Sequence, residues 1–412
     1  MPDGKKPVVL ILASTFPRWQ GDPEPGFILE LAKRLCSSWH VVVVCPHAAG
    51  AKESDVIEGV EVIRYRYAPE RWETLVNNGG IVTNLRNSKW KYLLVPSFVW
   101  CQAWSAWRTT RRLHVDVVHA HWLIPQGLLA ALLKVTSGRK VPYVVTSHGA
   151  DLFALQGGLL NGLKKMVLQQ SHSATVVSSA MLDRVVQMGI SPKKLDVIPM
   201  GVDMVDRFVP AVNSQRSASE LLFVGRLVEK KGLSHLLDAM PELIKAKPDT
   251  TLSIAGFGPD EVRLKAQVSA LGLNNKVHFL GALPQDALPQ LYQRAALFVA
   301  PFVQATSGDQ EGLPVALMEA IGCGCPAIAG NVAGLADIFG SYAHQCVVDP
   351  RDTAALVAAI LAALYHPEAA QLQANQMRAY LIDHLNWDAV AARYSAVLKN
   401  ATASQLAGGT SA

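Results

Sequence analysis

Several patterns that define whole classes of protein are missing from this sequence. Its six cysteines form no C-x-x-C pair, so neither a zinc site nor a disulfide framework is indicated. No window approaches the roughly 18 consecutive apolar residues that a membrane-spanning helix needs. A formal net charge of only +5 in 412 residues gives no electrostatic argument for a nucleic-acid partner. We therefore expect a globular protein of a reducing compartment, with its cysteines serving as buried apolar side chains.

Two further absences concern the start of the chain and its glycine motifs. The segment MPDGKKPVVLILAS contains an apolar run of six or seven residues, and FPRWQGDPEPG follows it instead of a small-residue cleavage site. This favours a first β-strand over a signal peptide. The loop after that strand matches neither the G-x-G-x-x-G dinucleotide fingerprint nor a Walker loop.

The chain does contain short runs of Val, Ile and Leu that alternate with helical patterns. Continuous apolar strands of this kind indicate a parallel sheet that is covered on both faces. The predicted strands are 8–13, 40–45, 60–65, 116–121, 143–148, 174–179 and 195–200 in the first half, and 220–226, 251–256, 276–281, 296–301 and 326–330 in the second.

A polar, irregular stretch at residues 206–219 separates the two series of strands. The pattern therefore predicts an α/β protein of two Rossmann-like, doubly wound domains, residues 1–205 and 206–386. A helix over 387–400 is expected to join the first domain, and 401–412 to form a flexible tail. Ligands of such sheets bind beyond the carboxyl ends of the strands, so we expect the site in a cleft between the two domains.

Cations and glycines follow two strands of the second half. Strand 220–226 ends in Gly225 and Arg226, and Lys231 follows shortly before a helix. Two cations beside a helix N-terminus can neutralise a diphosphate, although each alone is also typical of ordinary solvated charge. Strand 251–256 runs into the turn Gly256-Phe257-Gly258-Pro259, where glycine allows backbone to approach a ligand closely.

Two carboxylates bracket the apolar segment EGLPVALME. Pro314 suits the first turn of a helix, which we expect to run to about Ile321. Glu311 would then lie in the preceding loop and Glu319 more than one turn inside the helix. Carboxylates accept hydrogen bonds from the hydroxyls of a polyol, and the helix N-terminus suits an anion.

The first half places histidines at the ends of two predicted strands. Strand 143–148 ends in His148, and Asp151 follows three residues later, while His119 and His121 end another strand. A metal held by these histidines is not expected, because carboxylate or cysteine partners at ligand spacing are missing. Gly21 is a flexible point of the loop after the first strand, at the position of a phosphate loop.

Taken together, these motifs resemble one known family. The order H-G-x-D, strand-G-R-L-x-x-x-K-G, G-x-G-P and E-G-L-P-x-x-x-x-E is similar to that of the family 4 retaining glycosyltransferases, which have the two-Rossmann GT-B architecture. The resemblance covers the chain to the helix near Trp387. One departure concerns the loop after the first strand, where many members have a Gly-Gly pair and this chain has the longer, Pro-rich FPRWQGDPEPGF.

The resemblance implies a role for each matching residue of the second half. Arg226 and Lys231 would hold the diphosphate of a nucleotide-sugar donor, and Glu319 would bind the ribose hydroxyls. Glu311 would contact the hydroxyls of the transferred sugar. The remaining implied contacts with the donor come from Gly225, Gly258 in the base pocket, and the backbone N–H groups of Gly312 and Leu313.

Further implied roles fall on residues of the first half. His148 would lie beside the transferred sugar and its leaving phosphate, and the resemblance implies that it is catalytic, as are Arg226, Lys231 and Glu311. Gly21 is predicted to contact the donor and Asp151 the acceptor. The acceptor is expected to be set by loops around residues 66–112 and 150–160.

The activity implied is transfer of a hexosyl group from a nucleotide-diphosphate sugar to a glycan or lipid-linked acceptor, with retention of the anomeric configuration. No cofactor or metal is expected, because two cations would neutralise the diphosphate and no D-x-D pair follows a strand. The alternatives are a UDP-sugar 2-epimerase of the same architecture, a nucleotide-dependent oxidoreductase, and a sugar-binding module without catalysis.

Residues 86–112 combine basic ends with a row of tryptophans. Trp100, Trp104 and Trp107 fall at i, i+4 and i+7, which is one face of a helix. Such a helix is either an interfacial helix that binds an anionic membrane surface, or a core helix whose aromatic rings pack on the first sheet. Since many members of the family glycosylate lipids, we expect the membrane alternative and a peripheral, cytoplasmic location.

Overall fold

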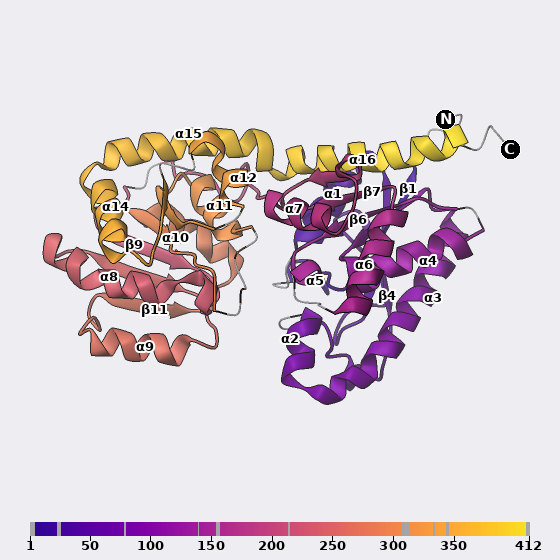
Figure 1. Cartoon of the computed structure of the whole chain (residues 1–412), viewed down its shortest axis with the longest axis horizontal. Coiled ribbons are helices and arrows are strands. Elements are labelled where there is room, and N and C mark those ends of the chain that lie inside the picture. Colours follow the sequence, from indigo (N-terminus) through magenta and orange to yellow (C-terminus); the bar gives the residue numbers. More distant parts are fainter. Residues whose placement is uncertain are drawn as a thin grey trace. The chain divides into compact units, whose positions relative to one another are not determined.

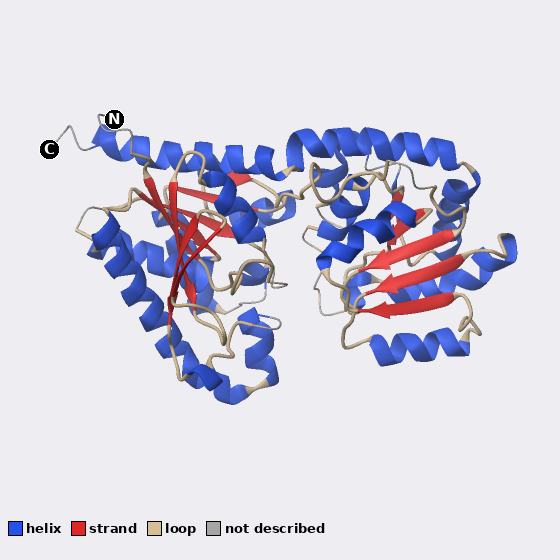
Figure 2. Cartoon of the chain, turned by 180° about the vertical axis from the view of Figure 1, so that it is seen from behind, coloured by secondary structure: helices blue, strands red, loops and turns tan. Residues whose placement is uncertain are grey.

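A computed structural model gives the structure of the protein and describes residues 5–22, 26–77, 80–138, 140–153, 157–212, 215–306, 308, 311, 313–332, 334–342 and 346–408. The chain forms two compact units. Unit 1 comprises Met1–Ile198 with Val390–Ala412, and unit 2 comprises Pro199–Ala389. In each unit, helices lie on both sides of a sheet (Figures 1 and 2).

The sheet of unit 1 has the strand order β3-β4-β2-β1-β5-β6-β7-β8. Its strands are β1 (Val8–Leu12), β2 (His40–Pro46), β3 (Ser54–Ile57), β4 (Val60–Tyr65), β5 (Val117–His121), β6 (Tyr143–Ser147), β7 (Ser173–Val176) and β8 (Leu195–Val197). The central strands are buried along almost their whole length, as the continuous apolar runs predict. The sheet is parallel from β4 to β8.

The edge strand β3 is an exception to the predicted parallel pattern. It pairs with β4 in the antiparallel sense, from Ile57 opposite Val60 outward. The two connecting residues, Glu58 and Gly59, have φ angles of 48° and 85°. Positive φ at both central positions is the requirement of a type I′ hairpin, so the Glu-Gly pair closes this turn.

Helices of unit 1 cover both faces of its sheet. They are α1 (Phe27–Leu35), α2 (Gly80–Asn87), α3 (Val95–Leu113), α4 (Leu128–Thr136), α5 (Ala150–Phe153), α6 (Gly158–Gln170), α7 (Ser179–Gln187) and the C-terminal α16 (Trp387–Gly408), with the short helices η1 (Glu70–Trp72), η2 (Lys89–Leu94), η3 (Leu123–Gly127) and η4 (Pro192–Lys194). The buried face of α16 is the predicted one, formed by Trp387, Val390, Tyr394 and Leu398. The predicted flexible tail from residue 401 is wrong as far as Gly408, because α16 continues to that residue.

Unit 2 is built on a parallel sheet of order β11-β10-β9-β12-β13-β14. Its strands are β9 (Glu220–Val224), β10 (Thr251–Ala255), β11 (Val277–Gly281), β12 (Leu297–Ala300), β13 (Ala327–Gly330) and β14 (Val347–Val348). Its helices are α8 (Leu233–Ala246), α9 (Glu261–Ala270), α10 (Leu288–Arg294), α11 (Val315–Gly322), α12 (Leu335–Phe339), α14 (Thr353–Tyr365) and α15 (Pro367–Leu385), with η5 (Glu229–Lys231), η6 (Gln285–Ala287) and η7 (Gly340–Tyr342). Apolar side chains pack on both faces of this sheet.

The expected domain boundary at residue 205 falls inside unit 2. Val202, Met204 and Phe208 are buried in the core that α11 and α15 also line. Val202 forms a parallel bridge with Asn386, which anchors the start of unit 2 beside its end. The unit therefore begins at Pro199.

The described residues bear on the expectations for membranes and metals. Within those residues, no single helix has the length and apolar composition to cross a bilayer, and only the bent pair α14 and α15 passes that test jointly. The same residues contain no cluster of three or more His, Cys, Asp or Glu side chains arranged to hold a metal ion.

Candidate functional site

Residues beyond the carboxyl ends of β9 and β12 bring two predicted site residues together. Lys231 ends the short helix η5 after β9, and Glu311 follows β12 along the chain. The ammonium Nζ of Lys231 lies 2.8 Å from Oε2 of Glu311 and 4.9 Å from the centroid of the Phe302 ring. The lysine stem passes Gly225, where a Cβ would lie in ordinary van der Waals contact with its methylenes, at 3.7 Å.

The pair of Lys231 and Glu311 is shielded from solvent. The two side chains are only 15% and 13% exposed. Apart from this ion pair, Oε2 of Glu311 has no hydrogen-bond partner among the residues that the structure describes. Arg226, by contrast, is exposed. Leu313 precedes α11, whereas Gly312 lies outside the described residues.

Glu319 lies in the second turn of α11, close to the predicted helical position. It is buried, and its Oε2 accepts a hydrogen bond of 2.9 Å from the hydroxyl of Tyr292. Nε2 of Gln285 lies 3.5 Å from the other carboxylate oxygen. Burial raises the pKa of Glu319 to about 7, and these hydrogen bonds only partly offset that shift. A carboxylate this costly to ionise is typical of a functional position.

The partners of Glu319 are candidate site residues that the sequence did not reveal. Tyr292 of α10 is fully buried, and its sequence context is that of an ordinary core aromatic residue. Gln285 belongs to η6. Arg207 Nη1 lies 3.3 Å from Oε1 of Gln285 and adds positive charge to the network. Only the three-dimensional proximity of α10 and α11 identifies this set.

The glycines after β10 have a structural role of their own. A Cβ at Gly258 would lie 2.3 Å from the carbonyl oxygen of Leu227, and one at Gly256 would lie 1.9 Å from that of Gly225. Gly256 also has a φ of 146°, which side-chain-bearing residues rarely adopt. Close packing of the turns after β9 and β10 therefore requires glycine at both positions before any ligand is considered.

In unit 1, His148 lies beyond the carboxyl end of β6 and contacts a second histidine. Its Nε2 is 2.9 Å from Nδ1 of His121, the last residue of β5, and the two rings stack at 5.2 Å. Nδ1 of His148 and Nε2 of His121 have no partner among the described residues. Burial, with the charge of His119 as a smaller cause, lowers the pKa of His148 to about 3, so its imidazole is neutral near pH 7.

Aromatic rings surround His148. The Trp122 and Phe27 rings lie 5.1 Å and 5.0 Å from it, centroid to centroid. Trp122 has a φ of 75° and a ψ of 141°, a backbone conformation that is strained for any residue except glycine. Two backbone hydrogen bonds hold Trp122 in this conformation. Its N–H donates to the carbonyl of Thr146, and its carbonyl accepts from the N–H of Gly127. Neither Trp122 nor His121 was predicted as a site residue, and the positive φ of Trp122 has no sequence signal.

Asp151, predicted to contact an acceptor, is buried and bonds to its own turn. One carboxylate oxygen accepts from the Ser147 hydroxyl at 2.9 Å and from the His148 N–H at 3.2 Å. The other accepts from the N–H of Leu123 at 2.7 Å. These bonds tie the loop that carries His148 to β6 and η3, and a contact of Asp151 with an acceptor stays a prediction.

The loop after β1 contains Gly21, which is exposed and has a φ of 81°. Just before it, the guanidinium of Arg18 makes two hydrogen bonds, of 2.8 and 2.6 Å, with the carboxylate of Asp22. Asp22 also accepts from the Arg18 N–H. The described part of this loop is thus held by an ion pair across Gly21, in place of the flexible Gly-Gly pair common in the family.

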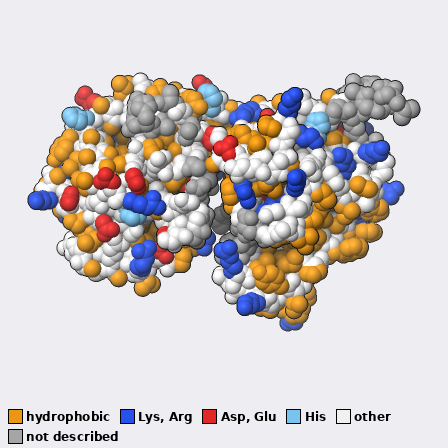
Figure 3. Space-filling view, viewed as in Figure 1, with side chains coloured by type: hydrophobic (Ala, Val, Ile, Leu, Met, Phe, Trp, Pro, Cys, Tyr) orange, Lys and Arg blue, Asp and Glu red, His pale blue; other side chains and the backbone are white. Residues whose placement is uncertain are grey.

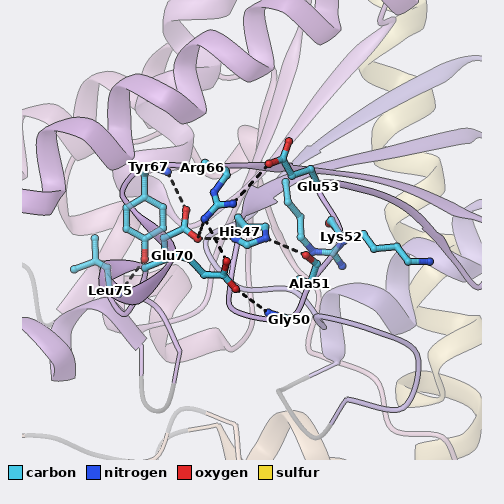
Figure 4. Close-up of polar contacts among 11 residues, drawn as sticks. His47, Gly50, Ala51, Lys52, Glu53, Arg66, Tyr67, Glu70 and Leu75 are labelled. Carbon is cyan, nitrogen blue, oxygen red and sulfur yellow. Dashed lines mark hydrogen bonds and ion pairs between the residues drawn. The ribbon is translucent and has the colours of Figure 1, made fainter.

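A second buried polar cluster lies beyond the carboxyl ends of β2 and β4 (Figure 4). Nδ1 of His47 is 2.5 Å from a carboxylate oxygen of Glu73, and its Nε2 donates to the carbonyl of Ala51 at 2.9 Å. Arg66 approaches the same carboxylate at 3.5 Å, and the N–H of Tyr67 donates to it at 3.3 Å. The cluster ties the segment after β4 to that after β2.

Comparison with known proteins identifies the family. The model described as Glycosyltransferase Family 4 matches residues 27–205, and the model described as Glycosyl transferases group 1 matches residues 206–381. The chain is 28% identical over 389 residues to a glycogen synthase of Mycobacterium tuberculosis, covering 88% of this chain and 87% of that protein.

Two further similarities agree with this result. A GDP-mannose-dependent alpha-(1-6)-phosphatidylinositol monomannoside mannosyltransferase of Mycolicibacterium smegmatis is 28% identical over 284 residues, which is 66% of this chain and 74% of that one. The solved sucrose-phosphate synthase of Thermosynechococcus elongatus matches with a TM-score of 0.75 at 19% identity, over 97% and 100% of the two chains. The chain therefore belongs to the family 4 glycosyltransferases and has their GT-B fold, as the motifs predict. The epimerase and oxidoreductase alternatives are not favoured.

Proposed function

We propose that this glycosyltransferase moves a hexosyl group from a nucleotide-diphosphate sugar to a glycan or lipid-linked acceptor, with retention of configuration and without a divalent metal. The observation that carries the proposal is the shielded ion pair of Lys231 and Glu311 beyond the carboxyl ends of two neighbouring strands, with buried Glu319 in the helix that follows. The GDP-mannose dependence in the name of the mycobacterial relative supports the class of donor.

In this proposal, the donor replaces the internal partners of the charged side chains. Lys231 turns from Glu311 to the diphosphate, and exposed Arg226 provides a second cation. Glu311, freed from its ion pair, accepts hydrogen bonds from the hydroxyls of the transferred sugar. Glu319 accepts those of the ribose, and Tyr292 holds its carboxylate in place.

The residues of unit 1 act on the sugar and the acceptor. His148 is neutral, so it donates one hydrogen bond without adding charge, and its contact with His121 selects which nitrogen carries the proton. Asp151 is a positioning residue for His148. The cluster around His47 and Glu73 keeps the segment after β4, expected to face the acceptor, in one conformation.

The chemical step follows from these roles. The bond between the anomeric carbon and the diphosphate oxygen breaks, and an acceptor hydroxyl forms the new bond on the same face of the sugar. The proton of that hydroxyl passes to the departing phosphate oxygen. Stabilisation of the leaving diphosphate by Lys231 and Arg226 supplies the main catalytic effect, since charge develops there in the transition state. A double displacement would need a carboxylate nucleophile, for which the sequence offers no obvious candidate.

Incubation with donor alone tests the reaction class and its stereochemistry. A thermal-shift screen of UDP-, GDP- and ADP-sugars first selects the donor, because a ligand at 100 times its dissociation constant stabilises a protein by about 2.7 kcal/mol. With that α-linked donor and water as acceptor, proton NMR should show the α-hexose appearing first and equilibrating later. The β-anomer appearing first would exclude retention, and a change of the sugar within the intact donor would indicate an epimerase.

Transfer should be independent of added divalent metal. The expectation rests on the two cations Arg226 and Lys231 and on the lack of a metal-ligand cluster in the described parts of the chain. Initial rates measured after dialysis against EDTA should match those of untreated protein within about twofold. A loss of activity in EDTA that Mg²⁺ or Mn²⁺ restores would show that a metal, and not these side chains, neutralises the diphosphate.

A further inference from the structure

An exposed apolar surface lies on unit 1, on two helices that contribute no residue to the proposed donor site. Trp100 and Trp104 of α3 are 72% and 57% exposed, and Leu132 and Val135 of α4 are 51% and 77% exposed. With the half-buried Trp107, these residues define the α3–α4 face. Side chains of this size are rarely exposed together unless they bind a partner or a membrane.

The α3–α4 face encloses an apolar groove of about 230 Å³. Its lining comes from Trp100, Ala103, Trp104 and Trp107 of α3, and from Leu129, Leu132, Leu133 and Thr136 of α4. Each helix contributes residues at i, i+3, i+4 and i+7, so one face of each helix is directed at the groove. The rings of Trp104 and Trp107, which line it, stack with their centroids 5.2 Å apart.

The tryptophans of the α3–α4 face are not on the buried side of α3, which packs on the sheet of unit 1. The side of α3 that is buried carries Phe98, Gln102, Ala106, Thr109 and Thr110. Gln102 even donates to the carbonyl of Ala13 from this side. The core-helix alternative for the three tryptophans is therefore wrong for Trp100 and Trp104, and the row they form faces outward.

The stretch of chain that contains α3 carries charge of one sign, although Arg112 at its end pairs with Glu61 of β4 at 3.1 Å. No Asp or Glu occurs between residues 74 and 115, a stretch that contains six cations, Arg86, Lys89, Lys91, Arg108, Arg111 and Arg112. Arg108 and Arg111 are exposed on α3, and Arg111 lies over the Trp107 ring at 5.1 Å. Figure 3 shows hydrophobic side chains gathered over the lower part of unit 1, with Lys and Arg at their margins.

We propose that the α3–α4 face docks unit 1 on the surface of an anionic lipid bilayer. Tryptophan is enriched at the boundary between headgroups and acyl chains, and the groove offers an apolar surface for acyl chains to contact. Cations at the margin attract anionic headgroups, by an amount that falls with salt. A protein partner would be expected to meet charges of both signs, whereas carboxylates are missing from this stretch, and that favours the bilayer as occupant.

Vesicle co-sedimentation of the full chain tests this docking. Wild-type protein should bind vesicles of phosphatidylglycerol and phosphatidylcholine at least tenfold more tightly than pure phosphatidylcholine vesicles at low salt. The double variant Trp100→Ser and Trp104→Ser, and the triple variant Arg108→Glu, Arg111→Glu and Arg112→Glu, should each lose at least tenfold in binding to the anionic vesicles. Val262→Ser, on the 82% exposed position of α9 in unit 2, is the matched control and should bind as wild type does.

Other occupants of the face give distinct results. Equal binding of wild type to anionic and neutral vesicles, or no binding at low salt, would overturn the proposal. So would a wild-type dimer in light scattering that the tryptophan variant converts to monomer, because a second copy would then cover the face. Donor hydrolysis by both variants at the wild-type rate would show that they are folded and that the membrane result is independent of the proposed reaction.

Discussion

Replacing Lys231 with alanine should lower kcat/KM for the donor by about two orders of magnitude without unfolding the protein. In the proposed reaction, this ammonium meets the diphosphate as negative charge develops on it. Removing one preorganised group that stabilises such charge typically costs about 10²- to 10³-fold in rate. The loss should appear mainly in kcat, because the interaction strengthens in the transition state. Steady-state donor hydrolysis measures it, with circular dichroism as the check on folding.

A merely structural role for Lys231 makes a different prediction. If the lysine only neutralised Glu311 across 2.8 Å, removing both charges would restore activity. The double variant Lys231→Ala and Glu311→Gln should instead have a kcat/KM no higher than that of the less active single variant, since each side chain loses its own contact with the donor. Lys245→Ala, at an exposed position of α8, is the matched control for loss of one lysine and should retain full activity. Recovery by the double variant would contradict the proposed roles.

The sequence was sufficient for the central strands and for the edge strands β8 and β11, and insufficient for the edge strands β3 and β14. Strands such as 40–45 and 143–148 are continuous apolar runs because both faces of a parallel sheet are covered, and the structure places β2 and β6 there. Strand β3 was missed because only two of its four residues, SDVI, are apolar and only Ile57 is buried. The pair Val347–Val348 is too short to show any period.

Helical periodicity identified the row of tryptophans in α3 but not the direction it faces. The helix carries two stripes, one with Phe98 and Ala106 and one with Trp100, Trp104 and Trp107, and both are compatible with a core. Which stripe is buried depends on how α3 packs on the sheet, which a single helix does not encode. The large aromatic area of the tryptophans kept the core alternative open, because burial is ordinarily most favourable for aromatic side chains. The outward direction of Trp100 and Trp104 was expected only from the resemblance to the family.

The candidate site was predicted residue by residue, but its internal contacts were not. Spacing placed Glu311 in a loop and Glu319 in a helix, and both positions agree with the structure. The hydrogen bond from Tyr292 to Glu319 joins residues 27 positions apart, so no local pattern reports it. The resemblance implies that Asp151 contacts the acceptor, and that role stays a prediction. Its bonds from Ser147 and from Leu123, 28 residues away, could not be predicted from the sequence.

Glu319→Gln should stabilise the ligand-free protein at pH 8 and weaken donor binding at least tenfold. Because burial raises the pKa of Glu319 from 4.5 to about 7, the folded state binds its proton more tightly than the unfolded state does. Below about pH 4.5 both states are protonated, and the carboxyl costs nothing. As pH rises towards 7 only the unfolded state loses the proton, so stability falls, and above pH 7 the full cost remains.

The neutral amide removes that cost while its carbonyl still accepts from the Tyr292 hydroxyl. A pKa difference of this size corresponds to a few kcal/mol, at about 1.4 kcal/mol per unit. Since each kcal/mol shifts the melting temperature of a unit this large by about 2–4 °C, the variant should melt several degrees above wild type at pH 8. At pH 5 the two should differ far less. Glu242→Gln, on an exposed position of α8, should change neither value.

A rise in stability together with a fall in donor affinity, both caused by Glu319→Gln, would distinguish a functional carboxylate from a structural one. If Glu319 were only structural, the bond from Gln285, which an amide nitrogen cannot accept, would be the main loss, and stability and donor binding would fall together. A ribose ligand instead needs a charged acceptor, and a hydrogen bond to a charged group is worth about 1.5–3 kcal/mol, which is at least tenfold in affinity. The Glu319 carboxylate is then retained although it lowers the stability of the free protein, because it accepts hydrogen bonds from the donor's hydroxyls when the donor binds. Destabilisation of the variant at pH 8 would refute this account of Glu319.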